Sequence, residues 1–164
     1  MERLRLALFQ PDIPQNAGTL FRLSACLGLG VDVIEPCGFV FDDRKLKRAG
    51  MDYLDRARVV RHPSWEVFRA SLAAAGRRLV LLTTKGEHRH DQFSFLPGDT
   101  LMVGRESSGV PADIAAAAAA RIRIPMVTGP RSINVALAAA LVTGEALRRL
   151  DGFPDESPAE EDLE

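Results

Sequence analysis

Four short segments of the sequence carry the residue types that bind and orient polar ligands. They are rich in Gly, Pro, Ser, Thr and Arg, and each follows an apolar run: residues 11–18, 83–86, 104–109 and 125–132. Glycine lets a backbone approach a ligand closely, and hydroxyl, amide and guanidinium groups supply hydrogen bonds. If the apolar runs are parallel strands, their carboxyl ends meet at one edge of a sheet, where ligands bind. The spacing therefore predicts one site built from four separate segments.

Several common catalytic motifs are absent. Gly28 and Gly30 precede an apolar run instead of following one, so they form no dinucleotide-binding fingerprint, and no P-loop pattern occurs. The stretch 104–109 (GRESSG) follows an apolar run, as a nucleophile elbow would. Neither Ser107 nor Ser108 has glycines two places away on both sides, which argues against a serine hydrolase.

Histidine and cysteine give no sign of a metal site. His88 and His90 are spaced as two ligands could be, but no third ligand follows nearby, so we interpret them as solvated loop residues and expect no metal. Cys26 and Cys37 form no CxxC pair and are typical of reduced thiols in a cytoplasmic protein. The apolar stretch near the N-terminus is too short for a secretory signal, and no run of about 18 apolar residues could span a membrane. We expect a cytoplasmic protein.

The apolar runs alternate with segments of helical spacing. Strands are expected at residues 4–10, 31–35, 57–60, 79–84, 100–103 and 121–124. Helices are expected at 16–29, 64–75, 111–120 and from a cap at Ser132 or Asn134 to about residue 150, and 40–50 is expected to be loop and a short basic helix. This alternation predicts an α/β fold, a parallel sheet covered by helices on both faces. Within it, the alanines 115–120 are expected to be plain helix.

Length and charge divide the chain into a body and a tail. The 164 residues are about one domain, which we place at 1–150. Seven of the 22 acidic residues lie in 151–164, so 1–150 carry 21 basic against 15 acidic residues. The excess of positive charge suits a polyanionic partner. Almost all the basic residues are arginine, a preference that suits phosphate binding and equally suits a GC-rich genome. Residues 151–164 are expected to form a disordered acidic tail.

Three blocks together resemble a known family. They are 13–22 (IPQNAGTLFR), 101–111 (LMVGRESSGVP) and 122–126 with 131–135 (IRIPM, RSINV). They are similar to the three motifs of the SpoU-type RNA ribose 2′-O-methyltransferases of the SPOUT superfamily. Residues 34–39, 43–53 and 82–86 resemble more narrowly the short, single-domain branch that methylates the tRNA wobble nucleotide. The likeness covers residues 4 to about 150.

The resemblance implies a fold, a cofactor and partners. The fold would be the SPOUT fold with a C-terminal trefoil knot, the methyl donor S-adenosylmethionine, the substrate tRNA and the assembly a homodimer. The function would be methylation of the ribose 2′-hydroxyl of the wobble cytidine or uridine. The same chemistry on another tRNA position or on rRNA stays open, as does a catalytically silent RNA-binding homologue.

The resemblance also implies which residues hold the donor. By it, the pocket would be lined by Leu82, Thr83, Gly86, Gly104, Ile124, Met126 and Ser132. Gly86 and Gly104 would let the backbone approach the adenosyl group closely. From the residues alone, Ile124 could instead be core and Ser132 a helix cap.

Four residues are the candidates for catalysis: Asn16, Arg22, Glu106 and Asn134. A guanidinium stays protonated, so we expect Arg22 to clamp the target phosphate and lower the pKa of the 2′-hydroxyl instead of acting as a base. Glu106 and Asn134 are expected to orient loops. The alternatives are a surface ion pair for Arg22 and a helix cap for Asn16.

A basic segment is the candidate RNA contact. It contains Arg44, Lys45, Lys47 and Arg48, and the alternative is a solvated helix face with local ion pairs. Three positions depart from the family pattern. Ser108 stands where a basic residue is common, which bears on RNA contact. Ala136 and Gly144 lie in the last expected helix, which bears on dimer packing.

Overall fold

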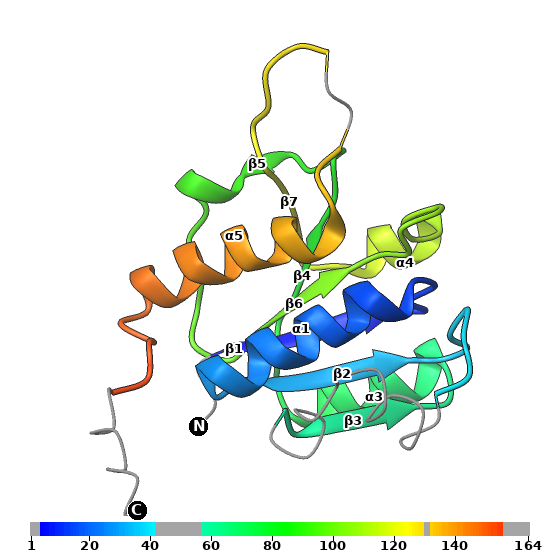
Figure 1. Ribbon diagram of the computed structural model, residues 1–164. Helices are drawn as coiled ribbons and strands as arrows, with labels where there is room; N and C mark the ends of the chain where they lie inside the picture. The colour runs from blue at the N-terminus through cyan, green and yellow to red at the C-terminus, as the bar shows by residue number, and fades with distance from the viewer. Residues whose placement is uncertain (1–3, 42–56, 130–131, 156–164) are drawn as a thin grey trace, which may run out of the picture.

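The structure is a computed structural model that describes residues 4–41, 57–129 and 132–155 (Figure 1). Its strands are β1 (Leu4–Phe9), β2 (Gly30–Ile34), β3 (Val59–His62), β4 (Leu79–Leu82), β5 (His88–Arg89), β6 (Asp99–Val103) and β7 (Ala120–Arg123). Its helices are α1 (Pro14–Leu27), α3 (Trp65–Ala74), α4 (Ala112–Ala117) and α5 (Val135–Arg149), with a 3-10 turn η1 (His90–Gln92). Strands and helices alternate along the chain as expected.

The strands form one parallel, seven-stranded sheet in the order β3-β2-β1-β6-β4-β7-β5. The α/β fold with a parallel sheet is confirmed. Strands β2 and β3 lie on one side of β1, and β6, β4, β7 and β5 follow on its other side. As a result β1, β6, β4 and β7 are consecutive neighbours, and the loops that follow them leave the same edge of the sheet.

Helices cover both faces of the sheet (Figure 1). Alternate side chains of β1 explain how, because Leu4, Leu6 and Leu8 pack in the core with α1 and α5, whereas Ala7 and Phe9 pack on the other side with α3 and α4. A strand directs successive side chains to opposite faces, so each face of β1 meets its own pair of helices. Helices α1 and α5 also contact one another, which brings the beginning and the end of the chain together.

Local signals fix the ends of the helices. Pro14 is at the start of α1, and Gly28 ends it with a left-handed φ of 66°. The Ser64 hydroxyl caps α3, at the start of the helix expected over 64–75, by accepting from the Val67 backbone N–H. Of the two caps considered for α5, the structure selects Asn134, whose side chain accepts from the N–H groups of Ala136 and Leu137.

Some boundaries differ from the expectation. The helix expected over 111–120 ends at Ala117, because the chain turns extended at Ala118 and Ala120 pairs with Val80 in the sheet. Sheet pairing here overrides the high helix propensity of alanine, so the prediction of plain helix over 115–120 is wrong for its second half. The strand expected at 57–60 lies at 59–62.

The region around His88 was not expected to contain a strand. Two residues, His88 and Arg89, pair with β7 at the sheet edge, and the 3-10 turn follows. His90 is only 8% exposed, so its interpretation as a solvated loop residue is wrong. His88 is exposed, as expected.

A buried ionic cluster lies on the α3 side of the sheet. The Asp32 carboxylate accepts from Arg5 Nε at 2.8 Å and lies 2.8 Å from His62 Nε2. The side chains of Arg5, Asp32 and His62 are 14%, 10% and 5% exposed. The cluster therefore ties β1, β2 and β3 together in surroundings that exclude most water.

Replacing Asp32 with Asn is expected to lower the free energy of unfolding by about 3–5 kcal/mol, because the largely buried Arg5 guanidinium loses its carboxylate. Urea denaturation at neutral pH measures this. The control is Glu35→Gln, since the Arg61–Glu35 pair is far more exposed and such a pair contributes at most about 1 kcal/mol. Equal losses in the two variants would contradict the prediction.

Candidate functional site

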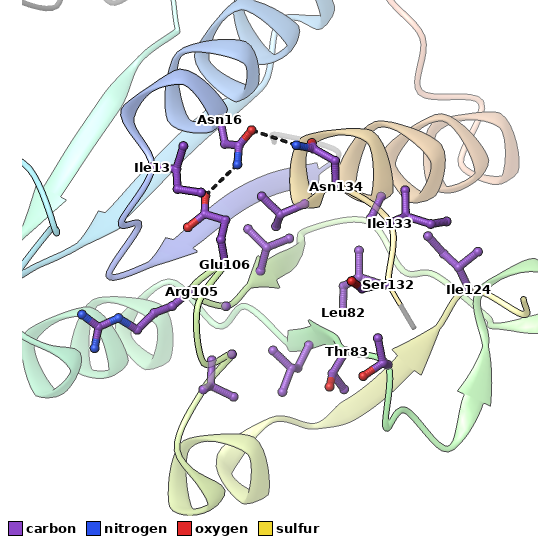
Figure 2. A pocket seen from close by; sticks show the side chains of 18 of the residues that line it. Ile13, Asn16, Leu82, Thr83, Arg105, Glu106, Ile124, Ser132, Ile133 and Asn134 are labelled. Atoms are coloured by element: carbon purple, nitrogen blue, oxygen red, sulfur yellow. Dashed lines mark hydrogen bonds between the residues drawn. The ribbon is translucent and has the colours of Figure 1, made fainter. Parts of the chain in front are cut away.

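A cavity of about 410 Å³ opens at the carboxyl edge of the sheet (Figure 2). Residues from all four predicted segments line it: Ile13 and Asn16; Thr83 and Thr84; Gly104, Arg105, Glu106 and Gly109; and Met126 and Ser132. Further lining comes from strand ends and from the start of α5: Leu81, Leu82, Val103, Val110, Ile124, Ile133, Asn134, Val135 and Ala138. The prediction of one site built from four separate segments is confirmed.

Three polar side chains form a chain of hydrogen bonds across one side of the cavity (Figure 2). Asn16 Nδ2 donates to Glu106 Oε1 at 3.2 Å, and Asn134 Nδ2 donates to Asn16 Oδ1 at 3.1 Å. Asn134 Oδ1 in turn accepts from the first backbone N–H groups of α5. The structure thus joins residues from three segments that are far apart in the sequence, and these are three of the four candidate catalytic residues.

In this series of hydrogen bonds, the roles of donor and acceptor can be assigned in only one way. A carboxylate accepts but cannot donate, so Glu106 must face the NH₂ group of Asn16, and Asn16 must then turn its carbonyl oxygen to Asn134. At the far end, the N–H groups at the start of α5 require the carbonyl oxygen of Asn134. Both ends impose the same orientation on the two amides. The alternative role of Asn16 as a helix cap is wrong, because α1 begins at Pro14.

One residue of the site was missed by the sequence analysis. Asp12 Oδ1 accepts from the backbone N–H of Glu106 at 3.1 Å, and Glu106 Oε2 accepts from the backbone N–H of Asp12 at 3.2 Å. Ser107 Oγ also donates to Asp12. Asp12 lies 94 residues from Glu106, so no local pattern pairs them, and only its place directly after β1 could have drawn attention to it.

The two carboxyl groups influence each other's pKa. Hydrogen bonding, chiefly with Glu106, lowers the pKa of Asp12 to about 2. Burial, and then the neighbouring Asp12 carboxylate, raise the pKa of Glu106 above its ordinary value. Asp12 is therefore the anion that stays ionised under all ordinary conditions, and Glu106 is the group that takes up a proton first.

The opposite side of the cavity is mostly apolar (Figure 2). Leu82 and Ile124 line it together with two hydroxyl residues, Thr83 and Ser132, and Met126 lies at a partly exposed position. Six of the seven residues predicted to bind the cofactor thus line the cavity: Leu82, Thr83, Gly104, Ile124, Met126 and Ser132. Ser132 is not the cap of α5, so that alternative is wrong.

The seventh, Gly86, lies outside the cavity lining. A Cβ atom at Gly86 would lie 2.3 Å from the Ile122 carbonyl carbon, so glycine is required there for contact with β7. At Gly104 a Cβ would lie 2.7 Å from the Gly109 carbonyl carbon, inside the turn that the Arg105–Gly109 backbone pair closes. Both glycines allow close packing of protein backbone.

Arg22 lies apart from the other candidate catalytic residues. It is exposed on α1, six residues beyond Asn16, and is not among the residues that line the cavity. The candidate RNA-binding residues Arg44, Lys45, Lys47 and Arg48 lie outside the described residues. So do 156–164 of the acidic tail.

In residues 4–41, 57–129 and 132–155, no group of three or more His, Cys, Asp or Glu side chains is placed to hold a metal ion. In the same ranges, no helix has the length and apolar character needed to cross a membrane.

Comparison with known proteins identifies the class. The model of the SpoU rRNA methylase family matches residues 3–144. The chain belongs to this family and is an RNA methyltransferase of the SPOUT fold. A Beijerinckia indica protein named tRNA (cytidine(34)-2'-O)-methyltransferase is 55% identical over 145 residues, which cover 88% of this chain and 91% of that protein.

Solved structures agree with this assignment. One, described as giving structural insights into the 2-OH methylation of C/U34 on tRNA, superposes with a TM-score of 0.84 at 39% identity and covers 91% of this chain and 97% of its own. Another is an AdoMet-bound rRNA methyltransferase from Sinorhizobium meliloti, with a TM-score of 0.80 and 26% identity. The match covers 92% of this chain and 59% of that one.

Proposed function

We propose that the chain is an S-adenosylmethionine-dependent tRNA (cytidine(34)/uridine(34)-2′-O)-methyltransferase, which methylates the ribose 2′-hydroxyl of the wobble nucleotide. Relatives described by this reaction match it over most of both chains. The observation that carries the proposal is the Glu106–Asn16–Asn134 chain of hydrogen bonds, because it brings the three sequence blocks of the resemblance to one cavity.

The cavity fits S-adenosylmethionine in size and chemistry. Its volume lies within the roughly 300–1,000 Å³ range of cofactor sites. Leu82 and Ile124 offer apolar surface for an adenine ring, and Thr83 and Ser132 offer hydroxyl groups for its polar edges. When bound, the donor supplies an electrophilic methyl group on sulfur. Met126 and the wall formed by Gly104 complete the pocket in this proposal.

The other residues act on the acceptor and on the loops around it. Arg22 clamps a phosphate of the RNA through its guanidinium fork and lowers the pKa of the 2′-hydroxyl by its charge. Glu106, Asn16 and Asn134 hold the first and third segments and the start of α5 in one arrangement, so that the 2′-hydroxyl and the methyl donor are aligned. Alignment of this kind can supply on the order of 7–11 kcal/mol of the barrier.

The basic segment with Arg44, Lys45, Lys47 and Arg48 is proposed as a track for the tRNA backbone, which carries closely spaced phosphates. The charge balance of residues 1–150 supports this role, since basic residues exceed acidic ones there. With a single Tyr and a single Trp in the chain, recognition by shape and backbone is favoured over base stacking.

A homodimer is part of the proposal, and the outer face of α5 supports it. Leu137 and Leu141 lie one turn apart on this helix and are 63% and 50% exposed. Gly144 continues the same face, and a Cβ there would meet no atom within 4 Å in its own chain. An exposed apolar stripe on an otherwise well packed helix is typical of a protein interface.

The double variant Leu137→Glu, Leu141→Glu is expected to be monomeric at concentrations where the unchanged protein is a dimer, because two charges would be buried at the interface. Sedimentation velocity measures the mass. Val67→Glu is the control, since Val67 is also exposed but lies on α3 at the opposite face of the sheet. A monomeric unchanged protein, or a dimeric double variant, would refute this arrangement.

The activity is tested on tRNA from cells that lack the gene. The tRNA is incubated with the protein and S-adenosylmethionine, digested, and analysed by mass spectrometry for 2′-O-methylnucleosides and their position. We expect methylation of nucleotide 34 that depends on both protein and donor. Methylation at another position would keep the chemistry and discard the wobble assignment. Donor binding without methylation of tRNA would direct the search to rRNA, and absence of donor binding would indicate a silent RNA-binding protein.

A further inference from the structure

The first and third segments of the site are held together by a reciprocal pair of acidic residues. Each carboxylate accepts the backbone N–H of the other residue, at 3.1 Å for the Glu106 N–H and 3.2 Å for the Asp12 N–H. This uses one oxygen of each carboxylate. Glu106 then has Oε1 left to accept from Asn16, and Asp12 has Oδ2 left to accept from Ser107.

The position of Asp12 is restricted from its other side as well. The backbone of Gly38 lies so close that a Cβ there would be 2.7 Å from Asp12 Cβ. The Gly38 N–H also donates to the carbonyl oxygen of Pro11, at 2.9 Å. Asp12 is thus enclosed between the segment after β2 and the turn after β6, and its carboxylate has little freedom to turn away from Glu106.

We propose that Asp12 is a positioning residue for methyl transfer, which acts by holding Glu106 so that Oε1 meets the Asn16 amide and sets the direction of the Glu106–Asn16–Asn134 chain. This inference rests on the proposed function for its link to catalysis. Asp12 itself touches neither donor nor acceptor, since it is not among the residues that line the cavity. Its effect passes through Glu106, which does line it.

The charge of Asp12 gives the proposal a signature that a purely structural contact lacks. Glu106 must be ionised to accept from both Asn16 and Asp12, so activity falls as the pH decreases through the pKa of Glu106, which lies above its ordinary value. The charged groups beside Glu106 are Asp12, from the loop after β1, and Arg105, its neighbour in the turn. Asn16 on α1 and Asn134 at the start of α5 are neutral. Removing the charge of Asp12 therefore lowers the pH at which activity falls on the acid side of the pH–activity profile.

Two conservative variants separate the charge of Asp12 from its contribution to the fold. Asp12→Asn is expected to lower kcat at neutral pH by about 10- to 100-fold, with the KM for S-adenosylmethionine changed less than about threefold, because misplaced groups affect the barrier more than donor contacts. Asp12→Glu keeps the carboxylate but is one methylene longer at an enclosed position, so it is expected to keep the fall of activity at acid pH and to restore only part of kcat. Asp113→Asn, exposed in the first turn of α4, is the matched control and is expected to change neither.

The same inference is tested without substrate by NMR titration of the Asn16 and Asn134 side-chain amides. In the unchanged protein we expect both to shift together with a midpoint above the ordinary pKa of a glutamate, and in Asp12→Asn we expect a lower midpoint. An unmoved midpoint, or amides that do not titrate, would overturn the role of Asp12. If the NMR result is as expected but no RNA is methylated, the proposed function fails and the positioning of Glu106 stands. If Asp12→Asn does not fold, Gly38→Ala serves instead: it pushes Asp12 away from Glu106, so it must lower kcat and also move the midpoint to lower pH.

Discussion

Replacing Arg22 with Ala is expected to reduce kcat/KM for methyl transfer by at least about 100-fold and to leave the Kd for S-adenosylmethionine within about twofold. Arg22 is exposed on α1 and lies outside the cavity lining, so the donor loses no contact when its side chain is removed. A positively charged hydrogen-bond donor directed at negative charge that develops in the transition state contributes a factor of roughly 10²–10³ to the rate. Single-turnover assays give the rate, and isothermal titration calorimetry gives the Kd.

Two further variants sharpen this test. Arg22→Lys keeps the positive charge but loses the planar fork, so it is expected to recover only part of the rate. Arg69→Ala removes an exposed arginine from α3 on the opposite face of the sheet and is expected to have no effect. Retained activity in Arg22→Ala, or a loss of donor affinity as large as the loss of rate, would contradict the role proposed for Arg22.

Replacing Gly86 with Ala is expected to destabilise the protein by about 3 kcal/mol or more, which is a decrease in Tm of roughly 6–12 °C. The added Cβ would meet the Ile122 carbonyl carbon at 2.3 Å and the Arg123 nitrogen at 2.7 Å, and both atoms are backbone of β7. The turn that contains Gly86 would have to move. Since Thr83 opens that turn and lines the cavity, donor binding is expected to weaken as well.

The matched control is the same substitution at Gly144, where a Cβ meets nothing within 4 Å. Gly144 lies inside α5, so alanine is expected to stabilise the helix by about 0.5–1 kcal/mol. Differential scanning calorimetry measures both variants, and the two changes in Tm should have opposite signs. A stable Gly86→Ala protein with normal donor affinity would show that β7 can move away at little cost.

Much of the fold could be predicted from sequence because its signals are local. The apolar runs of β1, β4 and β6 and the Ser64 cap of α3 are visible within windows of a few residues. The four segments that meet at the cavity could be predicted too, since each follows such a run. Strand order could not, because it depends on contacts such as β1 with β6 that are about a hundred residues apart in sequence.

The errors also have physical causes. Ala118 to Ala120 leave the helical state because their backbone groups are needed to pair with β4, and no property of alanine indicates this. Strand β5 is only two residues long and exists because β7 offers an edge. Asp12 was missed because its partner, Glu106, is joined to it by the fold alone. The trefoil knot stays a prediction from the resemblance.

The chain of hydrogen bonds from Glu106 through Asn16 to Asn134 has a consequence for synthesis. Its members are 90 and 118 residues apart, so a nascent chain cannot complete the site before α5 has left the ribosome. Contacts of such long range form late, because the entropy of closing the loop must be overcome first. A truncated or partly synthesised chain would therefore hold neither amide in place. Methyl transfer is therefore expected only from chains that extend past Asn134 into α5.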